Sequence, residues 1–415
     1  MRSLLILLVV GALGFLAGCS SSGTPVGVTP PPPPGQNIQA ITVDGGPLLN
    51  YANAAFVSVN VCLPGTSTCQ TVDHILIDTG SFGLRILASQ LTIALQPLTD
   101  TNGDQLNNCV QFLDNSFLWG TVDQADVKMG GEVASSTSIQ VVANPTAYSI
   151  PTACTTSSTG TGVNEDTQQL LGANGILGVG PEPFDCGLGC DPGSGTVQPL
   201  PYFLCSTGTG CQPTPVSCGT LCSDPNPNQQ LTNPVFNFAA DNNGVILELP
   251  TVSDAAATVT GSMIFGIGTQ SNNALGSATV FTLQSGDVFT TTYKGQAYSN
   301  SFIDSGSNGL YFPDATIPVC PGNLSSFYCP TSNLSGLTAT NTGANSATNT
   351  VTFGVDNTQT LFANNSADFA FSNLGGPLAG SFDWGLPFFY GRHVFTAIDG
   401  ATPPTGVPAG PFWAY

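Results

Sequence analysis

The chain has 415 residues, with 25 acidic side chains against only five basic ones, and its formal net charge is −20. Such a charge excludes nucleic acids and anionic lipid surfaces as partners that bind through electrostatic attraction. Only 7% of the residues are charged, while 49 are glycine and 32 are proline. This composition indicates many turns between short elements, in a chain long enough for two or three domains.

Residues 1–19 are typical of an export signal. Arg2 precedes an apolar stretch at residues 4–16, which is too short to cross a bilayer as a mature helix. The stretch ends in Leu-Ala-Gly-Cys at residues 16–19, which resembles the lipobox of bacterial lipoproteins. The resemblance implies that Cys19 is lipidated and that acyl chains hold the mature protein on the cell envelope, at the outer membrane. An ordinary cleaved signal with an incidental cysteine is the alternative.

The region after the signal is expected to be a linker followed by short strands. Five consecutive prolines within residues 20–38 favour an extended polyproline tether. Long amphipathic helical patterns are hard to find beyond it. Apolar or alternating runs bounded by glycine, proline or asparagine predict β-strands at residues 55–61, 138–142, 244–249 and 349–353. The sequence therefore predicts an all-β fold.

Cysteine usage agrees with export. Thirteen cysteines, less the lipidated Cys19, leave an even number that is consistent with six disulfides in an oxidising compartment. Two pairs are close enough in sequence to staple local hairpins, Cys62 with Cys69 and Cys320 with Cys329. Six more cysteines lie in a Pro/Gly-rich insertion at about residues 185–225. A zinc cluster is the alternative there, but the spacings lack a paired Cys-x-x-Cys signature, so no metal site is expected.

One short motif occurs twice. The two copies are Asp78-Thr79-Gly80-Ser81 and Asp304-Ser305-Gly306-Ser307. Each follows an apolar run that reads as a strand, and a carboxylate placed there needs hydrogen-bond donors, which the small hydroxyl residues can supply. The glycine permits a tight turn. If a duplicated fold brings the two loops together, the two carboxylates share one proton, because like charges about 3 Å apart cannot both ionise.

Four further segments accompany the two motifs in order along the chain. They are residues 173–180, 261–266, 384–389 and 394–399. Together with the two motifs, this series resembles the pepsin-like aspartic peptidases over roughly residues 40–405. The resemblance implies a bilobal double β-barrel with an active-site cleft between an N-terminal lobe at residues 39–235 and a C-terminal lobe at residues 236–415.

The resemblance also implies roles for the motif residues. Asp78 and Asp304 would activate a water molecule that hydrolyses a peptide bond, with no metal or cofactor. The remaining motif residues would support these two acids: Thr79 and Ser305 by bracing the loops, Ser81 and Ser307 by bonding the outer carboxylate oxygens, and Gly80 and Gly306 by letting backbone amides approach. The expected substrate is an extended peptide lying in the interlobe cleft of a monomer.

Two departures from that family leave other functions open. Arg85 occupies the position where eukaryotic members usually carry a tryptophan, and the expected flap at residues 111–122 has no tyrosine. Phe112 or Trp119 is expected to take the flap position. The alternative to a peptidase is therefore a catalytically weak or inactive protein that binds a peptide or an envelope partner in the same cleft. A structural surface lipoprotein that makes contacts through its Cys-rich insertion is a third possibility.

Overall fold

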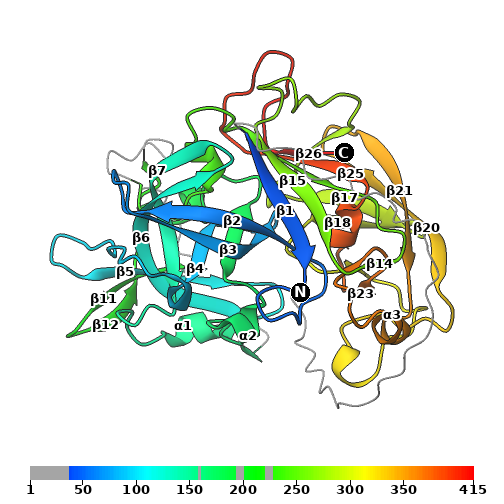
Figure 1. The fold of residues 1–415 in the computed structure, drawn as a ribbon, viewed down its shortest axis with the longest axis horizontal. Coiled ribbons are helices and arrows are strands. Elements are labelled where there is room, and N and C mark those ends of the chain that lie inside the picture. Colours follow the sequence, from blue (N-terminus) through cyan, green and yellow to red (C-terminus); the bar gives the residue numbers. More distant parts are fainter. Residues whose placement is uncertain (1–36, 158–159, 193–200, 220–227) are drawn as a thin grey trace, which may run out of the picture.

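The computed structural model describes residues 37–157, 160–192, 201–219 and 228–415 (Figure 1). The expected signal peptide, Cys19 and the expected linker up to residue 36 lie outside the described residues. The first strand already begins at Ile38, which the sequence analysis had assigned to the linker. Strands make up 44% of the described residues and helices 9%, so the all-β prediction is confirmed.

Twelve strands form among the described residues of the first half of the chain. They are β1 (Ile38–Asp44), β2 (Ala54–Cys62), β3 (Cys69–Asp78), β4 (Phe82–Leu87), β5 (Gln105–Gln111), β6 (Phe117–Met129), β7 (Glu132–Val142), β8 (Thr156–Ser157), β9 (Gly160–Thr161), β10 (Gly175–Val179), β11 (Tyr202–Ser206) and β12 (Gly210–Pro213). Between them the described residues include the short helices α1 (Thr152–Thr155), α2 (Gln168–Leu171), η1 (Ala88–Gln90) and η2 (Gly187–Gly189).

The second half adds the remaining elements. The strands are β13 (Gly244–Leu249), β14 (Ala255–Ala256), β15 (Val259–Phe265), β16 (Val280–Thr282), β17 (Phe289–Tyr293), β18 (Gln296–Ile303), β19 (Leu310–Phe312), β20 (Leu334–Thr342), β21 (Thr348–Val355), β22 (Ala370–Phe371), β23 (Gly375–Pro377), β24 (Asp383–Trp384), β25 (Arg392–Ala397) and β26 (Phe412–Ala414). The helices are η4 (Pro234–Asn237), η5 (Gly322–Leu324), α3 (Thr358–Asn364) and η6 (Leu386–Phe389).

A 15-stranded sheet connects the two halves of the chain. Its order is β12-β11-β5-β6-β7-β4-β10-β3-β2-β1-β15-β13-β25-β26-β16. An additional β2–β6 pairing closes the six strands from β6 to β2 into a ring, which removes their free edges. In Figure 1 this ring, blue to green, lies on one side, and β1 and β15 run beside each other between it and the second half. The seven-stranded sheet of the second half has the order β21-β20-β17-β18-β24-β19-β23.

Burial explains the strand patterns. β10 is buried at all five residues, because it lies between β3 and β4 and packs against one apolar cluster through Leu177 and against another through Ile176. Its sequence is accordingly almost continuously apolar. In β17 alternate residues are buried, as in a strand with one face toward the core. The largest apolar cluster contains residues from both halves, among them Ile77 and Ile303, which directly precede the two acidic motifs. Both loops therefore follow residues that are packed in the same apolar core.

Five disulfides lie within the described residues. Cys62–Cys69 and Cys320–Cys329 pair as predicted from their spacing. Two bridges staple the insertion locally, Cys186–Cys190 and Cys205–Cys211. The fifth, Cys109–Cys154, joins β5 to α1 across 45 residues, a pairing that spacing alone did not indicate. Among the described residues, no helix combines the length and the apolar character needed to cross a membrane.

Candidate functional site

The two acidic motifs occupy equivalent places in two similar arrangements of three strands. β10 runs parallel to β3 and antiparallel to β4, so it lies between the strands before and after the first motif. β24 runs parallel to β18 and antiparallel to β19, and thus lies between the strands around the second motif. The predicted sequence repeat is therefore also a repeat of local structure.

The two carboxyl groups face each other across the loops. A Cβ atom built at Gly80 would lie 2.7 Å from Cγ of Asp304, and one built at Gly306 would lie 2.7 Å from Oδ1 of Asp78. Each aspartate thus packs directly against the glycine of the opposite loop. Any larger residue at that glycine would overlap the carboxyl group of the aspartate. Asp78 is buried and Asp304 is half-buried.

Each carboxylate is held by the same pair of donors in its own loop. The Gly80 amide donates to Oδ1 of Asp78 at 2.9 Å, and the Ser81 hydroxyl donates to Oδ2 at 2.6 Å. In the second loop the Gly306 amide donates to Oδ1 of Asp304 at 2.8 Å, and the Ser307 hydroxyl donates to Oδ2 at 2.9 Å. Such donors favour the ionised form of a carboxyl group and fix its orientation.

The second residues of the motifs brace the loops against each other. The Ser305 amide donates to Oγ1 of Thr79 at 2.9 Å, and the Thr79 amide donates to Oγ of Ser305 at 3.1 Å. The Thr79 hydroxyl in turn donates to the backbone carbonyl of Ile303, and the Ser305 hydroxyl donates to the backbone carbonyl of Ile77. Both side chains are fully buried, so these four bonds are shielded from water and fix the spacing of the loops.

A cavity of about 930 Å³ opens above the two loops. Its lining includes Asp78 and Asp304, the end of β5, and the stapled hairpin β11–β12 of the Cys-rich insertion. The insertion reaches the cavity because β11 pairs with β5, and Phe203 of β11 lies in the wall. A volume of this size and a lining of apolar surface with a few convergent polar groups are typical of a ligand site.

The structure separates the two expected flap aromatics. β5 and β6 form a hairpin whose tip lies at the cavity, and Phe112 and Leu113 of that tip line it. Trp119 lies further along β6, is buried against Phe203, and donates its indole N–H to the carbonyl of Tyr148. Phe112 is therefore at the cavity, whereas Trp119 is a core residue that points elsewhere.

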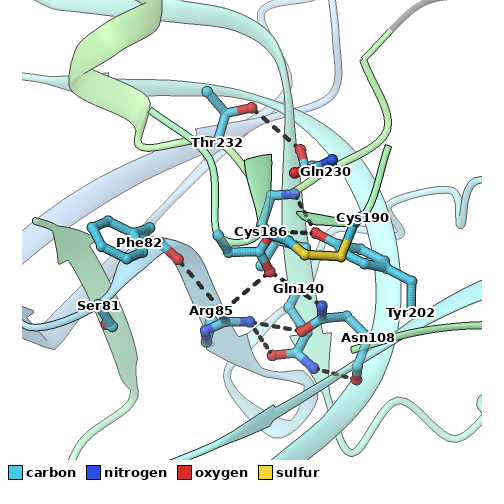
Figure 2. Close-up of polar contacts among 12 residues, drawn as sticks. Ser81, Phe82, Arg85, Asn108, Gln140, Cys186, Cys190, Tyr202, Gln230 and Thr232 are labelled. Carbon is cyan, nitrogen blue, oxygen red and sulfur yellow. Dashed lines mark hydrogen bonds and ion pairs between the residues drawn. A yellow bond between two sulfur atoms is a disulfide. The ribbon is translucent and has the colours of Figure 1, made fainter. Parts of the chain in front are cut away.

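A buried arginine network forms part of the cavity wall (Figure 2). The Arg85 guanidinium donates to Oδ1 of Asn108 at 2.9 Å and to Oε1 of Gln140 at 2.8 Å, as Figure 2 shows. It also lies 3.6 Å from the carboxylate of Asp185, which accepts the hydroxyl proton of Tyr202. Arg85 is only 1% exposed.

This network was not anticipated from the sequence, although Arg85 had been noted as a departure. Burial raises the pKa of Asp185, and the Arg85 charge together with the hydrogen bonds from Tyr202 and Asn108 opposes that rise. Tyr202 belongs to the insertion, so the network ties the insertion to the strand that leaves the first acidic loop. The sequence did contain a signal for this network. Arg85 is one of few basic residues and lies within an apolar strand, and a buried arginine requires a buried partner.

A protein-family profile described as "Protein of unknown function (DUF3443)" matches residues 33–415. The chain belongs to this family. No curated protein matches it. The DUF3443 match covers every described residue, and therefore both acidic loops and the whole cavity.

A cluster of carboxyl groups lies at the rim of the cavity in this DUF3443 chain. Asp287 lines the cavity, and Glu182 is hydrogen-bonded to it, with Asp399 close enough to add its charge. Burial, together with the charges of Asp287 and Asp399, raises the pKa of Glu182 to about 8. Burial raises the pKa of Asp287 to about 6. Glu182 and Asp287 therefore share a proton in mildly acidic solution.

The rim cluster predicts a pH-dependent stability. Both folded pKa values lie above the ordinary values of about 4, so the folded state binds protons more tightly than the unfolded chain, and the stabilisation is lost as the pH rises from about 4 to about 8. We expect Glu182→Gln to flatten this decline. The measurement is the urea midpoint of both proteins from pH 3 to 9, and parallel curves would contradict the prediction.

Proposed function

We propose that this chain is an aspartic-type endopeptidase with a pepsin-like bilobal fold, anchored through Cys19 in the bacterial cell envelope. The observation that carries the proposal is the pair of matched loops. Each aspartate packs so closely on the opposite glycine that an added Cβ atom would lie 2.7 Å from its carboxyl group, and each is held by its own amide and hydroxyl donors. If the two motifs were only turns that end two strands, their carboxyl groups would not need to lie close together.

The proposed chemistry needs only the chain's own residues and water. In the proposed mechanism the two carboxyl groups hold one proton between them, because two neighbouring carboxyl groups cannot both ionise. The ionised member takes a proton from a water molecule in the cavity, and the protonated member donates a hydrogen bond to the scissile carbonyl as the water attacks. The apparent titration belongs to the pair, so the acid and base roles are not assigned to individual aspartates.

The substrate is proposed to be an extended peptide. The cavity is lined by the end of β5 and by residues of β18, including Asn300 and Phe302. Strand ends of this kind offer backbone donors and acceptors to a peptide that lies between them. The cavity volume of about 930 Å³ accommodates several residues of a peptide substrate. Cleavage within a peptide chain is therefore favoured over removal of a terminal residue.

The second candidate is a peptide-binding protein without turnover. The flap supports it, because the hairpin tip at the cavity carries Phe112 and Leu113 and no tyrosine. An apolar tip can cover a bound peptide but donates no side-chain hydrogen bond to it.

One experiment separates the two functions. The purified protein is incubated with a mixed peptide library from pH 3 to 7, beside Asp78→Asn and Asp304→Asn. We expect cleavage by the wild type and a loss of more than about 1,000-fold in each variant, since each carboxyl group takes part in proton transfer. Folded wild type that retains peptides without cutting them would instead support the binding protein.

A further inference from the structure

A second cavity lies in the second half of the chain. Its volume is about 220 Å³, and none of the residues that line it also lines the larger cavity above the acidic loops. Its wall is formed by β21, by the segment between β22 and β23, by η6 and by the start of β25. A cavity of about 150 Å³ can hold benzene, so this one has room for a small organic molecule.

Among the described residues that line this cavity, Arg392 alone is charged. Its Nη1 donates to the carbonyl of Phe388 at 2.5 Å, and its guanidinium carbon lies 4.6 Å from the centre of the Phe388 ring. Within the described part of the chain it forms no ion pair with a carboxylate, whereas Arg85 pairs with Asp185. A chain with a net charge of −20 thus places one of its few cations in a cavity without an acidic partner.

The contact with Phe388 leaves one edge of the Arg392 guanidinium available. Nη1 is occupied, whereas Nε and Nη2 have no hydrogen-bond partner among the described residues. These two N–H groups form a planar fork that matches the two oxygens of a carboxylate. Burial lowers the pKa of Arg392, which indicates that its charge is only partly solvated, yet a guanidinium stays charged at any ordinary pH. An anion in the cavity would compensate this charge.

Polar groups in the wall can bind the rest of such an anion. Ser253 and Thr352 line the cavity and are exposed, so it opens to solvent at these residues. Neither hydroxyl is hydrogen-bonded to another described residue. Asn373 also lines the cavity, and its amide donates to Asp356 at 3.4 Å. Asp254 and Asp356 are close to the lining in sequence, but neither lines the cavity. Convergent neutral donors and acceptors of this kind favour a ligand with hydroxyl groups.

We propose that this cavity binds a small organic carboxylate that also carries hydroxyl groups. Nε and Nη2 of Arg392 donate to the carboxylate, and the hydroxyl groups of Ser253 and Thr352 bond to the remainder of the ligand. A bare inorganic ion would fill only a small part of the volume of about 220 Å³. The proposal is independent of peptide cleavage, because it uses no residue of the acidic loops.

The arginine side chains provide the readout. The chain has only three arginines, Arg2, Arg85 and Arg392, so nitrogen-15 labelling of arginine gives at most three Nε–H signals in NMR spectra of the purified protein. The signal that is lost in Arg392→Gln is that of Arg392. Glucuronate should shift this signal until the site saturates. The Arg85 signal is the internal control and should not move, because Arg85 is 1% exposed and lies in its own network.

Two further compounds separate the parts of the ligand. Glucose has a similar ring and hydroxyl groups without the carboxylate, and acetate has the carboxylate without the ring. We expect each to bind at least about tenfold more weakly than glucuronate, since a hydrogen bond to a charged group is typically worth that factor or more. Equal affinity of glucose would overturn the role of the carboxylate, and equal affinity of acetate would overturn the role of the hydroxyl groups.

Three variants test the role of Arg392, with binding measured by calorimetry. Arg392→Lys keeps the charge but loses the fork, and it should weaken glucuronate binding by about tenfold or more, with Arg392→Gln weaker still. Lys128→Gln removes a positive charge in β6, away from the cavity, and should bind as the wild type does. Circular dichroism and the urea midpoint check folding. Unchanged affinity in folded Arg392→Gln, or an Arg392 signal in the wild type that does not move above about 10 mM glucuronate, would overturn the proposal.

Discussion

Alanine in place of Gly80 or Gly306 is expected to lower peptide cleavage by about 100-fold or more while the protein stays folded. A Cβ atom at either position would lie 2.7 Å from a carboxylate atom of the opposite loop, closer than two such atoms can approach. The added methyl group must therefore push the two carboxyl groups apart. A displacement of about 1 Å at reacting groups is enough to cost about 100-fold in rate.

The control for this prediction is Gly208→Ala in the insertion. A Cβ atom at Gly208 would have no neighbour within 4 Å, so this variant should cleave at the wild-type rate. The measurement is kcat/KM on a peptide selected from the library, with circular dichroism and the urea midpoint as checks of folding. Full activity of Gly80→Ala would show that close packing of the two loops is not needed for cleavage.

Replacement of Arg85 by methionine is expected to destabilise the protein by about 3–5 kcal/mol. Methionine fills a similar volume but leaves the carboxylate of Asp185, 6% exposed, without a cation. Removing one partner of a buried ion pair typically costs this much, because the remaining charge has lost its compensation. Asn108 and Gln140 would also lose the donor that each accepts from.

A double-mutant cycle checks the origin of this loss. If the buried pair is responsible, Arg85→Met combined with Asp185→Asn should be less destabilised than the sum of the two single variants, since no charge then remains unpaired. His393→Gln is the comparison, because the two side chains of the His393–Glu248 pair are 68% and 29% exposed, and it should cost no more than about 1 kcal/mol. The free energy of unfolding from urea titration is the readout. Additive effects of the two buried variants would contradict the prediction.

Local sequence patterns were sufficient for four of the strands and for the two acidic loops. β2, β7, β13 and β21 contain the four predicted runs, because alternation and flanking turn residues act over a few positions. The bridges Cys62–Cys69 and Cys320–Cys329 were also predictable, since so few residues separate the partners that the chain brings them together in most compact arrangements.

Other features depend on contacts between distant segments. The Cys109–Cys154 bridge and the division between Phe112 at the cavity and Trp119 in the core follow from how β5, β6 and the insertion pack. No local pattern distinguishes an aromatic residue that covers a cavity from one that fills a core, because both require a strand with an apolar face.

The sequence by itself therefore determined the β-rich class, the two motifs and the chemistry that those residue types allow. Only the tertiary structure decided that the carboxyl group of Asp304 packs on Gly80 and that the Arg85 guanidinium lies beside the carboxylate of Asp185. The physical reason is one of range. Turn chemistry and side-chain alternation act between near neighbours, whereas the partner of a buried charge is selected by the packing of whole sheets.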